Sequence, residues 1–251
     1  LKNLALRKQI AALTNETQSY FLIGSSEYPK FIRQPSPGKK QFGNTAIFFS
    51  PQGKILGQYL KIHLVPFGEE IPYEKTIPWP AFIVPEDKKS FEIAGKEHTI
   101  FKLNDFKFGA VICWEVVFPQ LIRDFVNSGA QFMVNLTNEG WFGDSSAPYQ
   151  MAAIVAFRAV ENRVPFARAA NTGISCFIDR YGRITGRVNQ HNKDIFVEGH
   201  LTQIMKVTNE RTFYTQYGDV FTWGCLIVSI GFLMLAFFRK IRVTSMVKPT
   251  K

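Results

Sequence analysis

One cysteine lies where it could act as a nucleophile. Residues 110–112 (AVI) form a short apolar run that predicts a buried strand, and Cys113 follows it directly, ahead of Trp114 and Glu115. A side chain at the carboxyl end of a strand is held on rigid backbone, at the sheet edge where α/β proteins usually place their reaction sites. Cys113 is therefore the first candidate nucleophile, although a cysteine at the end of an apolar strand is more often a small buried hydrophobe.

Polar and ionisable side chains in two other segments could serve this thiol. Lys61 and Glu69 lie close together along the chain, and Asn138 and Glu139 follow a second apolar strand. A thiol needs a base to become a thiolate, and acyl transfer needs a cation or N–H donors to stabilise an oxyanion. Both kinds of group are therefore available in principle around Cys113.

His63, Cys176 and Cys225 are assigned no chemistry. A histidine such as His63 is more often a hydrogen-bonded structural residue than a base. Cys176 lies in a predicted strand and Cys225 in a long apolar segment. The three cysteines form neither a disulfide framework nor a C-x-x-C metal pair, so we expect no metal site and no cofactor.

The predicted elements place both polar turns at one edge of a sheet. Each apolar strand runs directly into its polar turn, and a helix follows. Helices are predicted over 4–17, 119–128 and 148–162, and strands over 20–24, 45–49, 54–58, 110–112, 132–137, 166–170, 175–178 and 183–188. We expect one large α/β domain from this order.

The segment between Lys61 and Lys89 is expected to be irregular, since it contains five prolines. A long irregular segment inside a compact domain is more often a functional loop than a filler. Its apolar residues Trp79, Phe82 and Ile83 would then dip into a bilayer surface or cover the site, and ordinary packing is an equally favoured alternative.

Most of the excess positive charge lies at the end of the chain. The net charge is +10, and the last 13 residues contain five basic side chains and no acid, which leaves +5 for the rest. Those five residues are Arg239, Lys240, Arg242, Lys248 and Lys251. Because no face interleaves basic and aromatic residues, we expect no nucleic-acid partner.

The segment 220–238 predicts a membrane span. Its 19 residues contain no charge, with Asp219 before them and Arg239 after them. That length matches the hydrocarbon core of a bilayer, whereas a buried core helix is the less favoured alternative. The basic flank predicts a cytoplasmic C-terminus, which places the preceding domain on the outer face of the membrane.

Six segments carry motifs that belong together. They are 59–69 (YLKIHLVPFGE), 112–115 (ICWE), 138–143 (NEGWFG), 157–163 (FRAVENR), 168–175 (RAANTGIS) and 212–219 (TFYTQYGD). As a set they resemble the nitrilase (carbon-nitrogen hydrolase) superfamily, and more closely its apolipoprotein N-acyltransferase branch. The match covers nearly the whole chain, and the terminal span belongs to that branch and not to soluble nitrilases.

The resemblance implies a nitrilase-like α-β-β-α sandwich followed by one C-terminal transmembrane helix. It divides the chain into a catalytic domain over 1–210 whose N-terminal part is missing, a juxtamembrane segment over 211–219, the transmembrane helix over 220–238 and a basic cytoplasmic tail over 239–251. The start at Leu1, with neither an initiator Met nor a signal peptide, likewise predicts the later part of a longer protein.

The resemblance also assigns roles to residues of the site. It implies that Cys113 is the nucleophile, Lys61 the oxyanion-stabilising cation, Glu69 an accessory carboxylate and Glu115 a carboxylate close to the thiol. The substrate-binding residues would be Trp114, Asn138, Glu139 and Trp141. Asn138 and Glu139 either line the pocket or only cap their turn, and the sequence leaves this open.

The base of the family's Glu-Lys-Cys triad has no counterpart in this chain. The family places it in a Trp-Pro-Glu motif upstream of the first helix, and Glu27, in the run SSEYP, is in the wrong context to replace it. Either the missing part of the protein supplies the base and further membrane helices, or the protein is inactive.

The implied activity is that of a membrane-bound acyltransferase. A fatty acyl chain would pass from a phospholipid donor, through a Cys113 thioester, to the N-terminal amine of a diacylated prolipoprotein acceptor. The enzyme would lie in the bacterial inner membrane with its catalytic domain on the periplasmic face. The alternatives are a nitrilase-type amidase and an inactive, membrane-tethered interaction domain.

Overall fold

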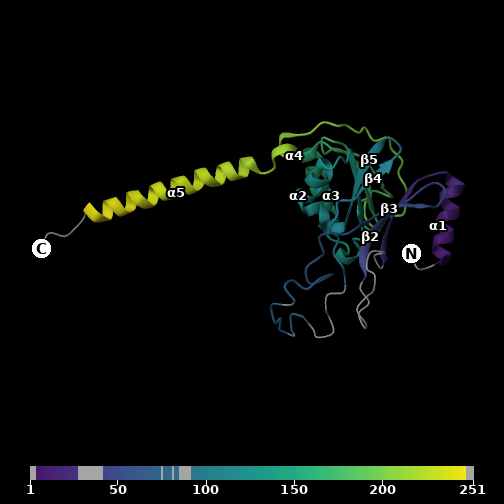
Figure 1. The fold of residues 1–251 in the computed structure, drawn as a ribbon, viewed down its shortest axis with the longest axis horizontal. Coiled ribbons are helices and arrows are strands. Elements are labelled where there is room, and N and C mark those ends of the chain that lie inside the picture. The colour runs from purple at the N-terminus through teal and green to yellow at the C-terminus, as the bar shows by residue number, and fades with distance from the viewer. Residues whose placement is uncertain (1–3, 28–41, 75, 81, 85–91, 247–251) are drawn as a thin grey trace.

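The structure, a computed structural model, has two β-sheets that face each other (Figure 1). It describes residues 4–27, 42–74, 76–80, 82–84 and 92–246. The elements are α1 (Leu4–Thr17), β1 (Phe21–Glu27), β2 (Gly43–Phe49), β3 (Ile55–Leu60), β4 (Ile100–Leu103), β5 (Phe106–Ile112), η1 (Cys113–Val117), α2 (Pro119–Asn127), β6 (Phe132–Thr137), η2 (Gly140–Phe142), α3 (Ala147–Asn162), β7 (Phe166–Ala170), β8 (Cys176–Ile178), β9 (Ile184–Arg187), α4 (Phe213–Tyr217) and α5 (Val220–Met246).

The central strands of the larger sheet end at a common edge. In sheet order β4-β5-β6-β7-β8-β9, the pairs β5–β6 and β6–β7 are parallel. The smaller sheet, β1-β2-β3, is antiparallel throughout. Parallel neighbours bring their carboxyl ends together, so the turn after β5 and the turn after β6 lie at one edge, as predicted.

Side-chain alternation along β2 shows how the layers pack. Ala46 and Phe48 point into the main core, where the Phe48 ring meets that of Phe108 at 5.2 Å. Ile47 and Phe49 point to the opposite face and pack with Ile10 of α1. One strand therefore has one face toward the second sheet and the other toward a helix.

The outer face of the larger sheet is covered by α2 and α3 (Figure 1). At Gly109 of β5 an added Cβ would lie 2.6 Å from the Phe125 ring of α2, so only glycine permits this close helix–sheet approach. The layer order is thus α1, the small sheet, the large sheet, and α2 with α3. The predicted α-β-β-α sandwich is confirmed.

Several elements have bounds in the structure that differ from the predicted ones, because of how the strands pair. The first strand runs to Glu27 because it pairs with β2 along its whole length. Strand β4 was not predicted, and it is held by antiparallel pairing with β5. The described parts of 61–89 form turns without helix or strand, while residues 75, 81 and 85–89 of that prediction lie outside the described residues.

Helix α5 projects from the domain (Figure 1). Its part Val220–Arg239 is long and apolar enough to cross a membrane, and none of it is buried against the rest of the described chain. A candidate C-terminal span is therefore present where it was predicted. Of the predicted basic tail, residues 247–251 lie outside the described residues, as do the side chains of 240–246.

Candidate active site

Lys61 directly follows β3 and is fully buried beside Glu69. Its Nζ donates to both carboxylate oxygens of Glu69, at 2.7 Å each. The Val65 N–H also donates to Glu69 Oε2, at 2.9 Å. A buried ammonium needs such partners, because an unpaired charge away from water is costly. The turn after β3 thus holds a cation in a fixed place.

Glu115 is a fully buried carboxylate with four hydrogen-bond donors. Its Oε1 accepts from Tyr59 Oη at 2.8 Å, Ile62 N at 2.7 Å and His63 N at 3.1 Å, and its Oε2 accepts from Ile112 N at 2.7 Å. Burial raises the pKa of Glu115, and the donors oppose that shift. Burial and the carboxylate also raise the pKa of Tyr59, so its hydroxyl remains a donor.

These bonds connect the ends of two strands in different sheets. Ile62 comes directly after Lys61, and Ile112 comes directly before Cys113. One carboxylate, Glu115, therefore fixes the backbone beside the cation relative to the backbone beside the thiol.

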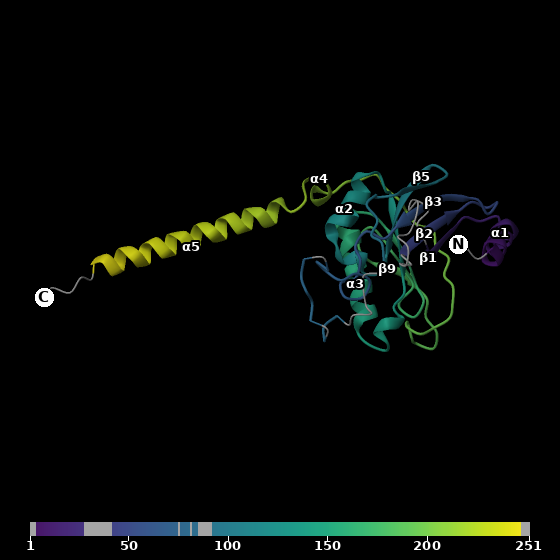
Figure 2. The same ribbon diagram turned by 60° about the horizontal axis from the view of Figure 1, so that its bottom comes forward.

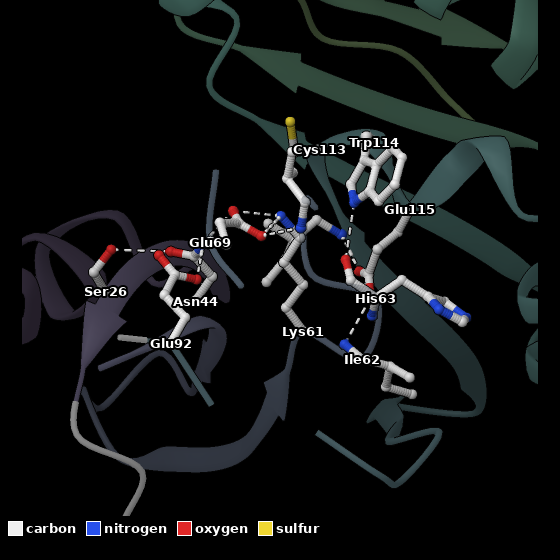
Figure 3. A network of polar contacts seen from close by, with 12 residues as sticks. Ser26, Asn44, Lys61, Ile62, His63, Glu69, Glu92, Cys113, Trp114 and Glu115 are labelled. Atoms are coloured by element: carbon white, nitrogen blue, oxygen red, sulfur yellow. Dashed lines mark hydrogen bonds and ion pairs between the residues drawn. The ribbon is translucent and has the colours of Figure 1, made fainter. Parts of the chain in front are cut away.

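Cys113 occupies a strained turn at the end of β5. Its φ of 56° lies in the left-handed region, and the 3₁₀-helix η1 begins at the same residue. A non-glycine residue in that region costs about 1 kcal/mol, and such strain is characteristic of functional sites. The thiol is half-buried, and Figure 3 shows its sulfur pointing away from the Glu69 and Glu115 carboxylates.

A second polar cluster extends the site on the far side of Lys61 (Figure 3). Asn44 Nδ2 donates to Glu69 Oε1 and to Glu92 Oε2, at 2.8 Å each, and its Oδ1 accepts from Ser26 Oγ at 3.0 Å. Both the amide nitrogen and the amide oxygen of Asn44 are therefore hydrogen-bonded. Burial and the Glu69 carboxylate raise the pKa of Glu92 to about 7, and Lys61 opposes this.

Trp114 and His63 brace the same turn. The indole Nε1 of Trp114 donates to the His63 carbonyl at 2.9 Å, and the imidazole of His63 stacks on the Phe118 ring at 4.1 Å. Burial lowers the pKa of His63 below its ordinary value, so the ring is mostly neutral near pH 7. These contacts fit the structural role expected for His63.

The turn after β6 divides its side chains between the surface and the core. Trp141 is 86% exposed on η2. The Asn138 Oδ1 accepts from Asn171 Nδ2 at 2.7 Å, and Asn171 Oδ1 accepts from Glu139 N at 2.9 Å. The Glu139 carboxylate is turned inward and is only 1% exposed.

Glu139 forms a buried ion pair with Arg168 of β7. The Arg168 guanidinium also donates to Asn135 Oδ1, and its Nε donates to the Ile174 carbonyl at 3.2 Å. An added Cβ at Gly173 would clash with the Glu139 carboxylate, so that position requires glycine. Glu139 therefore fixes the turn from inside.

A cavity of about 410 Å³ lies at the sheet edge, next to the turn that begins with Cys113. It is lined by Gly24, Ser25, Ser26, Asn44, Thr45, Ile112, Leu136, Thr137, Asn138, Ala169, Ala170 and Asn171. Ile112 places it next to Cys113, and Asn138 is the predicted substrate-binding residue that lines it. A larger cavity, of about 540 Å³, lies at β8 and β9 and contains none of the predicted site residues.

Lys61, Glu69, Trp114 and Glu115 lie around the Cys113 turn (Figure 3). In the comparison with protein families, residues 2–202 match the model of the carbon-nitrogen hydrolase family. The chain belongs to the carbon-nitrogen hydrolase family. That match covers most of the domain that forms the sandwich.

Curated proteins named apolipoprotein N-acyltransferase are similar to the chain. The protein of Geobacter metallireducens is 38% identical over 232 residues, which cover 92% of this chain and 42% of the relative. Apolipoprotein N-acyltransferase 1 of Treponema denticola is 35% identical, over 82% of this chain and 38% of the relative. The predicted resemblance is thus confirmed, and the chain spans less than half the length of these relatives.

Solved structures support the fold at lower identity. An amidase from Nesterenkonia sp. is 20% identical, with a TM-score of 0.53, over 73% of this chain and 62% of the amidase. A mutant of the same amidase, with a TM-score of 0.54, has an acetamide moiety added covalently at its active-site cysteine. These solved structures support the sandwich fold of the chain.

Other predicted residues lie apart from this site. Cys176 is 2% exposed in β8, and burial raises the pKa of its thiol to about 11. Cys225 is exposed on α5. Arg158 and Glu161 of α3 form an ion pair at 2.8 Å, and Arg163 lies over the Tyr181 ring. Among the described residues, no cluster of histidine, cysteine and acidic side chains could hold a metal.

Sequence patterns did not reveal the hydrogen-bond partners of the site. Asn44 stands one residue before a predicted strand, and Glu92 lies 48 positions away from it, so no local pattern links them. Arg168 belongs to the motif at 168–175, yet nothing in the local sequence pairs it with Glu139. A charged residue inside the short strand β7 is the signal that could have indicated a buried partner.

Replacing Glu115 by Ala is expected to lower stability strongly. The change leaves three backbone N–H groups and the Tyr59 hydroxyl without their acceptor, at a cost of about 3–5 kcal/mol. Glu115→Gln should cost less, because the remaining oxygen still accepts from some of these donors. Its amide NH₂ group would face the Ile112 N–H, so that one donor would lose its acceptor. Thermal unfolding of the whole protein in detergent tests this, with the exposed Glu97→Ala as control. Equal melting temperatures for Glu115→Ala and Glu97→Ala would contradict the assigned role.

Replacing Glu92 by Gln is expected to change how stability depends on pH. The folded-state pKa of Glu92 is raised to about 7, so its stabilising contribution is complete below the ordinary value near 4.5 and is lost as pH rises through 7. Between pH 5 and pH 8 the wild type should therefore lose about 1 kcal/mol more than Glu92→Gln, allowing for solvent screening of this partly exposed group. Melting temperatures of the wild type and of Glu92→Gln at pH 5 and pH 8 measure this difference. An equal change in melting temperature between the two pH values in both proteins would refute the prediction.

Proposed function

We propose that the whole protein is a membrane-bound N-acyltransferase. It moves a fatty acyl chain from a phospholipid, through a Cys113 thioester, to the N-terminal amine of a diacylglyceryl-cysteine lipoprotein. The observation that supports this best is the Cys113 turn itself, joined through Glu115 to the buried Lys61–Glu69 pair. The relatives named apolipoprotein N-acyltransferase and the candidate span α5 support the choice of substrates.

The first half-reaction forms the thioester. The Cys113 thiolate attacks the ester carbonyl of the phospholipid, and the Lys61 ammonium with a backbone N–H stabilises the tetrahedral oxyanion. The C–O bond then breaks, and the lysophospholipid leaves with the proton that the base took from the thiol. We propose that this base lies in a part of the relatives' length that the chain does not span, as the family resemblance implies.

The second half-reaction transfers the acyl chain. The free amine of the acceptor attacks the thioester carbonyl, and the same oxyanion contacts stabilise the second tetrahedral intermediate. The C–S bond breaks, the amine proton passes through the base to the Cys113 thiolate, and an amide is formed. We propose that Asn138, which lines the cavity, and the exposed Trp141 contact the substrates, and that Trp114 shapes the turn around the thiol.

Apolar side chains near the site supply a membrane contact in this proposal. In the irregular segment after Lys61, Phe82 is 86% exposed and Ile83 is 45% exposed, while the Trp79 ring packs on Phe67 at 5.1 Å. Figure 2 shows this segment on the side of the domain from which α5 leaves. We propose that Phe82 and Ile83 enter the bilayer surface and that Trp79 stabilises the loop.

The proposed placement follows from the charges that flank α5. The catalytic domain over 1–210 and the juxtamembrane segment over 211–219 lie on the periplasmic face of the bacterial inner membrane, residues 220–238 cross it, and the basic tail over 239–251 is cytoplasmic. Both substrates are lipid-anchored, so a membrane-bound enzyme meets them in the same plane.

A transfer assay tests this function. The whole protein in vesicles is given a phospholipid with an isotope-labelled acyl chain and a diacylated lipopeptide with a free N-terminal amine. We expect the labelled acyl mass on the lipopeptide amine. Hydrolysis of simple amides without any lipopeptide product would favour the amidase alternative, which the amidase fold neighbour suggests. Folded protein that forms neither product would favour an inactive interaction domain.

A further inference from the structure

The short helix α4 is held in place by side chains of α2. Arg123 Nε donates to the carbonyls of Tyr214 at 3.1 Å and Thr215 at 3.0 Å, and its Nη2 donates to that of Gln216 at 3.0 Å. Asn127 Nδ2 also donates to the Thr215 carbonyl, at 3.0 Å. A five-residue helix is not stable alone, so these contacts determine that α4 forms here.

A second set of contacts fixes α4 to the end of α3. The Thr215 hydroxyl, fully buried, donates to Asn162 Oδ1 at 3.0 Å, and Thr212 Oγ1 donates to the Glu161 carbonyl. Thr212 also caps α4, since its Oγ1 accepts from Thr215 N at 3.0 Å. Both helices of the outer layer therefore hold the same turn.

The membrane helix begins immediately after this contact. Gly218, with φ 68°, ends α4, and an added Cβ would lie 3.2 Å from the Arg123 guanidinium. Only Asp219 separates Gly218 from α5. The chain thus turns over the Arg123 side chain and enters α5 without a flexible linker.

The same helix α2 is connected to the nucleophile. The 3₁₀-helix that starts at Cys113 ends at Val117, and Phe118 N–H donates to the Glu115 carbonyl at 3.1 Å just before α2 begins. A rigid path therefore runs from Cys113 through η1 and α2 to Arg123, and from there to α5.

We propose that Arg123 is a positioning residue that sets the orientation of Cys113 relative to the bilayer. The proposal rests on the acyltransferase function above. Its guanidinium satisfies the carbonyls at the end of α4, where the helix dipole favours a cation, and so transmits the position of α5 to the domain. The acyl ester of a phospholipid stays at a fixed depth in the bilayer, so it reaches the Cys113 thiol only when the thiol lies at that depth. A water-soluble ester can diffuse to the thiol whatever the orientation of the domain.

The test compares two reactions of the whole protein. The first is acylation of Cys113 by a water-soluble short-chain p-nitrophenyl ester in detergent, and the second is acyl transfer from phospholipid to a diacylated lipopeptide in vesicles. Arg123→Ala is expected to lower the vesicle rate about 10-fold or more and to change the detergent rate less than about twofold. Arg183→Ala, at the exposed β8–β9 turn, is the matched control and should change neither rate.

Further variants keep the test decisive. Should Arg123→Ala fail to fold, Asn127→Ala and a Gly-Ser insertion after Gly218 should show the same selective loss. An unchanged vesicle rate, or equal losses in both reactions, would overturn the positioning role.

Limited proteolysis separates this proposal from the acyltransferase function. Cleavage between residues 208 and 219 should be faster in Arg123→Ala than in the wild type, and equal cleavage rates would overturn the contact with α4. Wild-type protein that forms no acyl adduct would instead contradict the acyltransferase function.

Discussion

Cys113→Ala is expected to abolish acyl transfer in the whole protein, with a loss of about 10⁴-fold or more. The reaction passes through a covalent thioester, and alanine offers no nucleophile. The domain should still fold, because the thiol is half-buried and alanine meets the same left-handed backbone that cysteine already occupies. The rate of lipopeptide N-acylation and the melting temperature in detergent measure the two effects.

The matched control for this variant is Cys176→Ala. The Cys176 thiol is buried in β8 with a pKa raised to about 11, so it is protonated at neutral pH and inaccessible to substrate. Activity should be largely retained in this variant. Transfer by Cys113→Ala at a rate close to that of wild type would refute the assignment of the nucleophile.

Lys61→Met is expected to lower acyl transfer by about 10³-fold. Methionine preserves much of the apolar stem but removes the ammonium that stabilises the oxyanion, and losing one such donor costs about 10²–10³ in rate. The variant should also be less stable, since the Glu69 carboxylate loses its cation and keeps only the Asn44 and Val65 donors.

A double variant separates the two consequences of losing Lys61. In Lys61→Met with Glu69→Gln, the uncompensated charge is gone, so the melting temperature should recover most of its loss. Activity should remain as low as in Lys61→Met alone. Recovery of activity together with stability would show that Lys61 acts only through folding, against the proposed chemistry.

The sequence predicted the elements that position the site better than it predicted the contacts within it. The apolar runs before Cys113 and before Asn138 predicted strands that end at one sheet edge, and the parallel register of β5 with β6 confirms this. The uncharged run after Asp219 similarly predicted α5, which is a candidate span by its length and composition.

Contacts between distant segments could not be predicted in this way. Glu115 is bonded to backbone N–H groups more than 50 positions away, and such groups have no signature in a sequence. Asn138 and Glu139 are neighbours with the same local pattern, yet one lines the cavity and the other pairs with Arg168 inside the core. The inward turn of Glu139 goes with its ion pair to Arg168 of β7, a contact that the local pattern does not contain.

Intact-mass measurement of the Cys113 adduct tests the central claim most directly. The whole protein is incubated with phospholipid and weighed, then given a diacylated lipopeptide with a free amine and weighed again, beside Cys113→Ala. We predict a fatty-acyl mass increment in the wild type only, which the lipopeptide amine discharges. An increment that persists in Cys113→Ala, or folded wild-type protein that gains no acyl mass, would contradict a Cys113 thioester.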